Sequence, residues 1–182
     1  TLELVRGDWR TYTQDLSNPL VPPKSDGQIV VSSVNIEENG QRQPVNYVLP
    51  PGISRMFDSS QPQLLQQNEQ ALSMKITDLS PADARAVYKS TAYDLRRYKR
   101  LQMFAHAEAP IDESKTLSNG DFSVFIRLGS DYKNNYYEYE VPLDLTPHST
   151  ILYNTNNSAD QEKVWPLNNT LNFKLETLTD LK

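Results

Sequence analysis

The side chains that could support chemistry lie mainly on three successive segments, Lys99–Glu108, Phe122–Leu128 and Tyr136–Val141. Each segment is rich in aromatic and β-branched residues and lacks helical spacing, which is typical of strands. Successive side chains of a strand point to opposite faces, so residues of one parity can act together. If the three strands are neighbours in one sheet, one face collects charged and aromatic side chains: Arg100, Gln102, Phe104, His106, Phe125, Arg127, Tyr136, Glu138 and Glu140.

This polar and aromatic face is the strongest candidate for a binding site. A concave sheet with aromatic platforms and hydrogen-bonding groups suits the capture of a sugar or a peptide. The alternative is a solvated face crossed by Arg–Glu pairs, or a face covered by another part of a larger protein. The candidate ligand-binding residues are Phe104, His106, Phe125, Arg127, Tyr136 and Glu138. On the opposite face we expect Met103, Ile126 and Tyr139 to lie in the core.

Motifs for catalysis or metal binding are weak. His106 and Glu108 could form an acid–base or metal-ligating pair, but the one other histidine, His148, lies in a proline-flanked turn. Glu138 and Glu140 could form a glycosidase-type carboxylate pair with Glu108, although exposed strand faces often carry such pairs. Oxygen atoms of Asp131, Asn134 and Asn135 could bind Ca²⁺ or simply form a turn. There is no cysteine, no phosphate-binding loop and no serine nucleophile elbow. We therefore expect no catalytic residue, no metal and no cofactor.

The composition limits the class of protein. The 182 residues fit a single domain, 1–182, and carry a net charge of -5 with both signs interspersed, which argues against nucleic-acid binding. No apolar run approaches the length of about 20 residues that a membrane helix needs, so we expect no membrane insertion by this segment. Because Thr1 is not a natural start, we expect an internal segment of a longer protein.

The spacing of the elements predicts the fold class. The segments 28–37 and 71–79 have strand patterns, and Ser80-Pro81 is typical of a short helix start that would run through Val87. Residues 154–163 have the composition of an exposed loop, and 171–175 that of a closing strand. Strands that recur about every 8–12 residues indicate an all-β fold, an antiparallel, jelly-roll-like β-sandwich with one or two short helices.

One loop, from Tyr47 to Gln70, combines a rigid Pro-Pro-Gly corner with apolar side chains. Loops that a rigid sheet positions often carry function. Met56 and Phe57 are the candidate partner-contact residues. Alternatively, these two side chains attach the loop to its own domain.

Three groups of sequence segments are unusual enough to indicate a family. They are Val34–Gly40 with Pro44–Ile53, Gln67–Leu72 with Asp83–Lys89, and Asp94–Phe104 with Phe125–Tyr132 and Tyr136–Leu143. In these segments, the chain resembles the SprA/Sov family of very large cell-surface and gliding-motility proteins of the Bacteroidetes, and the resemblance extends from Leu2 to Lys182. The resemblance implies the outer-membrane translocon of the type IX secretion system, a giant β-barrel that exports folded cargo. It carries over no catalytic residue.

The resemblance also implies partners and a location. The expected partners are other parts of the parent barrel, a PorV-type shuttle or plug protein, and secreted cargo. The strand pattern lacks the lipid-facing alternation of a barrel wall, so we expect a soluble segment on the extracellular or periplasmic face of the outer membrane. The expected function is therefore non-catalytic, a contribution to protein export and gliding motility through protein contacts. The alternative is a carbohydrate- or peptidoglycan-binding module that uses the face of Phe104, Phe125 and Tyr136.

Overall fold

The computed structural model describes residues 9–16, 26–57, 66–91, 93–111, 116–132 and 134–180. Its strands are β1 (Arg10–Tyr12), β2 (Gln28–Asn35), β3 (Gln70–Thr77), β4 (Ala86–Tyr88), β5 (Arg100–Met103), β6 (Ser123–Gly129), β7 (Tyr136–Pro142) and β8 (Leu171–Lys174). Its helices are α1 (Ile36–Asn39), α2 (Ser158–Val164) and α3 (Leu175–Asp180), with the 3₁₀ turns η1 (Leu95–Arg97) and η2 (Leu167–Asn169).

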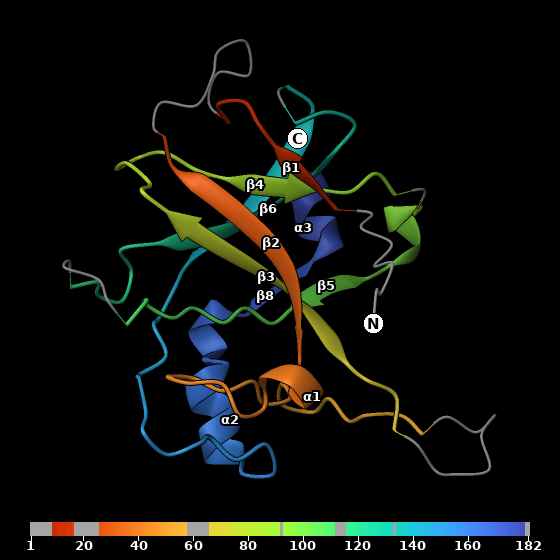
Figure 1. Ribbon diagram of the computed structural model, residues 1–182. Coiled ribbons are helices and arrows are strands. Elements are labelled where there is room, and N and C mark those ends of the chain that lie inside the picture. The colour runs from red at the N-terminus through yellow and green to blue at the C-terminus, as the bar shows by residue number, and fades with distance from the viewer. Residues whose placement is uncertain are drawn as a thin grey trace.

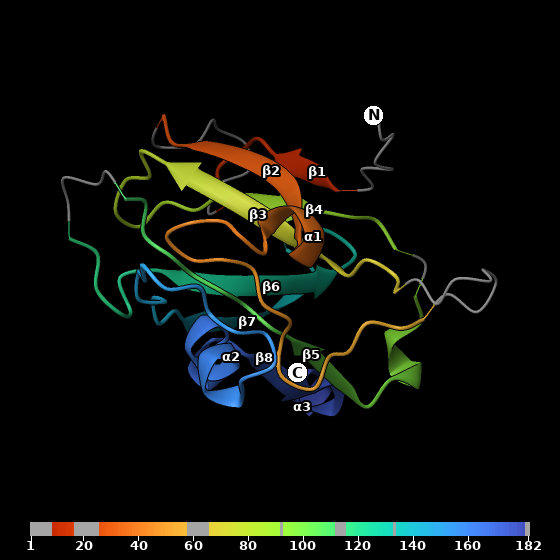
Figure 2. The same cartoon turned by 60° about the horizontal axis from the view of Figure 1, so that its bottom comes forward.

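All strand pairs of the described residues are antiparallel and form two-stranded sheets, β1–β4, β2–β3, β5–β8 and β6–β7 (Figure 1). The predicted fold class, an antiparallel all-β fold with short helices, is confirmed. Figure 2 shows the long β2–β3 ribbon at one side of the molecule, β6–β7 in the middle, and α2 and α3 at the other side.

The β2–β3 ribbon follows from its sequence pattern. β2 is β-branched at four of its eight residues, Ile29, Val30, Val31 and Val34, and contains no glycine or proline.

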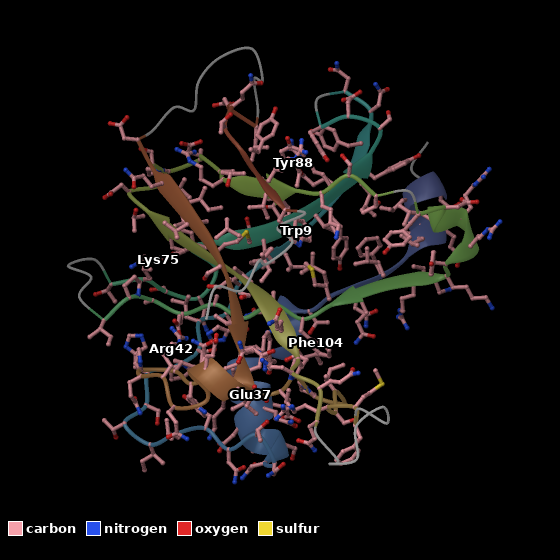
Figure 3. The ribbon with its side chains drawn as sticks, turned by 45° about the vertical axis from the view of Figure 1, so that its right-hand side comes forward. Trp9, Glu37, Arg42, Lys75, Tyr88 and Phe104 are labelled. Carbon is pink, nitrogen blue, oxygen red and sulfur yellow. The ribbon has the colours of Figure 1, made fainter. Side chains whose placement is uncertain are left out.

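 β3 pairs with β2 over its full length, from Gln28 opposite Thr77 to Asn35 opposite Gln70. The side chain of Lys75 in β3 is exposed (Figure 3).

The β6–β7 hairpin matches two of the three predicted central strands, and its register places Arg127 opposite Glu138 and Ile126 opposite Tyr139. The third strand, β5, was expected in the same sheet, and this prediction is wrong because β5 pairs with β8. A long connection separates β5 from β6, so no tight turn favours their pairing. β8 instead supplies Leu171 and Phe173, which are 0% and 8% exposed and make the pairing a means of burying apolar surface.

The fully buried core lies mostly outside the central strands. One cluster, here called the Trp165 cluster, consists of Val45, Tyr47, Val48, Tyr153, Val164 and Trp165. Met103 was expected in the core but is 38% exposed, and Ile126 and Tyr139 are half-buried. The structure places Tyr139 against Phe173 of β8, with ring centroids 4.4 Å apart.

Two predictions for local structure are also wrong. No helix follows Ser80, because Ala82 adopts a positive φ of 62° and the chain enters β4 instead. Residues 154–163, expected as an exposed loop, contain most of α2. The side chain of Asn157 caps this helix by accepting hydrogen bonds from the backbone N–H groups of Ala159 and Asp160.

Candidate functional site

The structure brings four of the predicted ligand-binding residues together on the β6–β7 hairpin. Nε of Arg127 donates a hydrogen bond to Glu138 over 2.5 Å. The guanidinium carbon lies 4.3 Å from the ring centroid of Tyr136 and 5.3 Å from that of Phe125. Nη1 of Arg127 also donates to the backbone carbonyls of Leu16 and Tyr132, both at 3.2 Å.

These contacts occupy the groups that a ligand would need. The Arg127 side chain is only 14% exposed, and its charge is paired with Glu138. A sugar that stacked on Tyr136 or Phe125 would compete with the guanidinium for the ring faces. The geometry therefore favours a structural role, in which Arg127 holds Leu16 and Tyr132 against the hairpin. Ligand binding by these residues stays a prediction.

The other two predicted residues, Phe104 and His106, lie elsewhere. β5 ends at Met103, so strand parity no longer decides where they point. Phe104 and His106 pack against Trp165, with ring centroids 6.4 Å and 5.8 Å away. The face that the sequence predicted as one site is thus divided between the hairpin and the Trp165 cluster.

His106 belongs to a row of polar side chains that joins distant segments. Its Nδ1 lies 2.8 Å from the carbonyl oxygen of Val164 and 3.1 Å from Oγ1 of Thr146. Its Nε2 lies 3.4 Å from Glu108, which forms a bidentate ion pair with Arg42. The row has the order of a hydroxyl–imidazole–carboxylate relay, but Thr146 is only 2% exposed and its hydroxyl donates to backbone carbonyls. It therefore presents no accessible nucleophile.

The ionisation of Glu108 makes the stability that this row contributes depend on pH. Burial alone would raise the pKa of Glu108, but hydrogen bonds and charge from His106 and Arg42 lower it below its ordinary value of 4.5. A lowered folded-state pKa stabilises the protein above the unfolded pKa, and this contribution is lost as the pH falls through the folded value.

We expect Glu108→Gln to lower the free energy of unfolding by about 1–3 kcal/mol at neutral pH, because hydrogen bonds to a charged group are lost. The difference in the free energy of unfolding between this variant and the unaltered chain should shrink as the pH falls below 4.5. Urea unfolding at a series of pH values measures it. Glu162→Gln, which removes an exposed carboxylate from α2, is the control. A difference that stayed constant with pH would contradict the assignment to Glu108 ionisation.

The remaining carboxylates and turn residues have partners within the chain. Glu140 accepts a hydrogen bond from Ser123, and Glu138 is paired with Arg127, so neither stands beside Glu108 as a carboxylate pair. Asp131 accepts hydrogen bonds from the backbone N–H groups of Asn134 and Asn135, which is the turn that was weighed against a Ca²⁺ site. In the described parts of the chain, no group of three His, Asp or Glu side chains could hold a metal ion.

The two candidate partner-contact residues lie on an open groove. Met56 and Phe57 are 70% and 56% exposed, and Ile53 beside them is 42% exposed. The groove has a volume of about 1000 Å³. It is lined by Ile36, Leu49, Ile53, Ser54, Arg55, Met56, Phe57, Gln66, Thr155, Asn156, Ser158 and Gln161. Arg55, its one charged lining residue, is paired with Glu37, and the other lining residues are apolar or carry neutral polar side chains.

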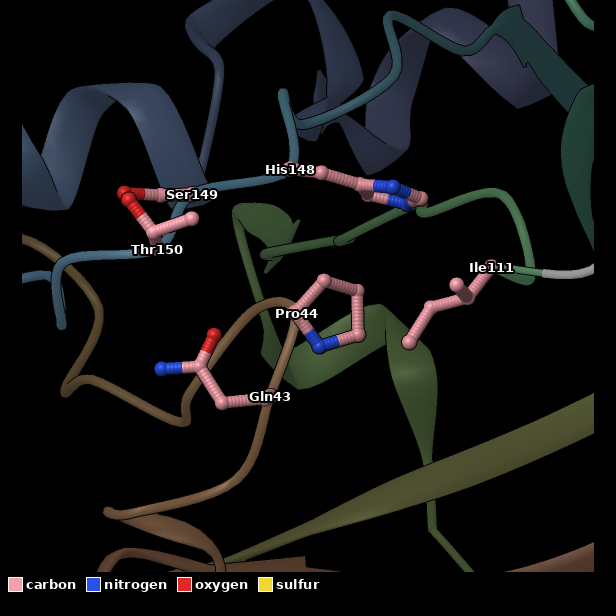
Figure 4. Close-up of a pocket in the computed structure, with 6 residues that line it drawn as sticks. All are labelled: Gln43, Pro44, Ile111, His148, Ser149 and Thr150. Carbon is pink, nitrogen blue, oxygen red and sulfur yellow. The ribbon is translucent and has the colours of Figure 1, made fainter.

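A smaller hollow of about 290 Å³ lies near the other histidine (Figure 4). Its lining residues are Gln43, Pro44, Ile111, His148, Ser149 and Thr150. Nε2 of His148 lies 2.7 Å from the carbonyl oxygen of Ala109, so the imidazole holds the 109–111 segment to the 147–150 segment. This contact makes His148 a structural residue of the hollow.

Sequence reasoning missed the residues that the 154–165 segment contributes. Trp165 contacts His106 and Phe104, while Thr155, Ser158 and Gln161 line the groove. The signal that could have found them is Asn157 followed three residues later by Asp160, a helix-start pattern. A helix there would have placed Val164 and Trp165 on one buried end.

The family model SprA_N, described as motility related/secretion protein, matches residues 1–182. No curated protein matches the chain. Within the described residues, no helix has the length and apolar character required to cross a membrane.

Proposed function

Because the chain belongs to the SprA_N family of motility related/secretion proteins, we propose that it is a non-catalytic domain that serves protein export by contact with other proteins. The proposal places it in an outer-membrane translocon of the type IX secretion system, where it also contributes to gliding motility. Its partners there are other parts of the parent barrel, a PorV-type shuttle or plug protein, and secreted cargo.

The observation that carries this proposal is the groove of Met56 and Phe57. Apolar side chains of this size are mostly buried in proteins, and adjacent exposed ones with a polar rim mark interaction sites. Ile53, Met56 and Phe57 lie on a loop that hydrogen bonds anchor: Nε of Arg55 donates to the carbonyl of Gln67 over 2.9 Å, and the N–H of Gln67 donates to the carbonyl of Met56 over 2.7 Å. A loop that hydrogen bonds already anchor loses little conformational entropy when a partner binds.

We propose a non-catalytic role because the polar groups that could act in catalysis are paired or buried. Glu108, Glu138 and Glu140 each have a partner within the chain, and the Thr146 hydroxyl is buried. A general acid or base must reach the proton of a bound substrate. These groups instead connect segments of the fold, which supports a role in stability.

The double substitution Met56→Ser and Phe57→Ser tests the proposal. Since both side chains are exposed, the free energy of unfolding of the chain should change by less than about 0.5 kcal/mol. In cells that carry the same change in the native protein, secretion of cargo into the medium should fall strongly. Thermal unfolding of the chain and quantification of secreted proteins are the two measurements.

A matched control removes two other exposed apolar side chains, which lie elsewhere on the surface. Ile151 and Leu167 are 79% and 85% exposed and do not line the groove. Their replacement with serine should leave both stability and secretion unchanged. If the Met56/Phe57 variant secreted normally, or if it unfolded the isolated chain, the groove would not be a docking site.

A further inference from the structure

The outer edge of β2 is an open strand edge. In the described part of the chain, β2 pairs with β3 alone, and Figure 2 shows β2 on the side of β3 away from β6. The backbone N–H and C=O groups along such an edge form a row that an extended chain can complete. The occupant that fits this row is therefore another strand.

β2 lacks the features with which proteins usually protect an open edge. Its sequence, Gln28–Asn35, has no charged residue, no proline and no glycine. Charged side chains, prolines and bulges are the common protections, and uncharged strands rich in valine and isoleucine pair readily. Val30 is 60% exposed, so a large apolar side chain on this strand remains uncovered.

The edge is also held in place. Nε of Arg85 donates a hydrogen bond over 2.8 Å to the carbonyl of Gly27, the residue directly before β2. The Arg85 side chain is 5% exposed and paired with Asp83, so this anchor is buried. A fixed, extended strand needs little ordering before it pairs.

We propose that β2 pairs antiparallel with β2 of a second copy of this chain, around a two-fold axis at Val30. This register places Val30 opposite Val30 of the second copy and Ile29 opposite Val31, so every central pair is apolar. Because β2 is uncharged, the pairing brings no like charges together. β3 is the less suitable edge, since it carries Lys75. A two-fold contact of this kind is self-complementary and closed.

The pairing joins two ribbons into a four-stranded sheet in the order β3, β2, β2, β3. A two-stranded ribbon is only marginally stable by itself, and further strands stabilise it. The half-exposed apolar side chains Leu72 and Met74, both 41% exposed, then lie on a wider common surface. The dimer thus removes the open edge of β2 and stabilises the β2–β3 ribbon.

A single introduced cysteine tests the register directly, because the chain has no cysteine of its own. Opposed residues of an antiparallel pair have Cα atoms about 4.5–5.5 Å apart, within disulfide range. Under mild oxidation, Val30→Cys should therefore become mostly disulfide-linked dimer. Leu167→Cys, at an 85% exposed position outside the strands, should remain mostly monomer.

Sedimentation equilibrium gives an independent measurement. The unaltered chain should show a monomer–dimer equilibrium, and Val30→Lys should weaken it by at least about tenfold by opposing two like charges. Leu167→Lys has the same charge change and should dimerise like the unaltered chain, with circular dichroism confirming that each variant is folded. A purely monomeric unaltered chain, equal crosslinking of the two cysteine variants, or undiminished dimerisation of Val30→Lys would each overturn the proposal.

Discussion

Replacement of Trp165 with alanine is expected to lower the free energy of unfolding by about 3–5 kcal/mol, the cost of a large cavity in a packed core. Trp165 is 8% exposed and makes edge contacts with Tyr47, Phe104 and His106. Its indole N–H donates to the carbonyl of Val48 over 2.9 Å. The side chain therefore joins three distant segments, and its loss should affect all of them.

Urea unfolding followed by circular dichroism measures this loss, since the substitution removes one of the two tryptophans that fluorescence would report. Trp165→Phe is the control. It keeps most of the aromatic contact but leaves the Val48 carbonyl without its donor, so a smaller loss of about 1–3 kcal/mol is expected. If Trp165→Ala cost less than about 1 kcal/mol, the Trp165 cluster would not be the packed core of the chain.

Arg85→Met is the second substitution with a large expected effect. The side chains of Arg85 and Asp83 are 5% and 4% exposed, and their ion pair measures 2.9 Å. Removal of Arg85 leaves the buried Asp83 carboxylate without its counter-ion, which costs about 3–5 kcal/mol. The substitution also removes the donor to the Gly27 carbonyl and so loosens the start of β2.

Two further variants separate charge burial from loss of packing. The double variant Asp83→Asn with Arg85→Met removes both charges and should be more stable than Arg85→Met alone. Arg96→Met breaks a pair of the same spacing, Asp94–Arg96, whose side chains are 37% and 91% exposed, and should leave the unfolding midpoint unchanged. Equal losses for Arg85→Met and Arg96→Met would show that the Asp83–Arg85 pair is effectively solvated.

The sequence alone determined the parts of the fold that depend on local contacts. The β-branched residues of β2 and the side-chain alternation in β3, β6 and β7 predicted strands, because both are properties of the strand itself. The short turn between β6 and β7, built by Asp131, Asn134 and Asn135, brings Arg127 opposite Glu138. Family membership was also readable from the sequence, since the strings that carry the resemblance are long and unusual.

Only the tertiary structure decided which distant segments meet. Strand parity placed Phe104 and His106 on the polar face on the assumption that β5 pairs with β6. β5 instead pairs with β8, because this pairing buries Leu171 and Phe173. The Trp165 cluster likewise combines residues 45–48 with 153, 164 and 165, which have no strand or helix period in common. The free energy of such contacts comes from apolar surface buried between segments far apart in the chain, and a sequence pattern records only what each segment can bury, not the partner that covers it.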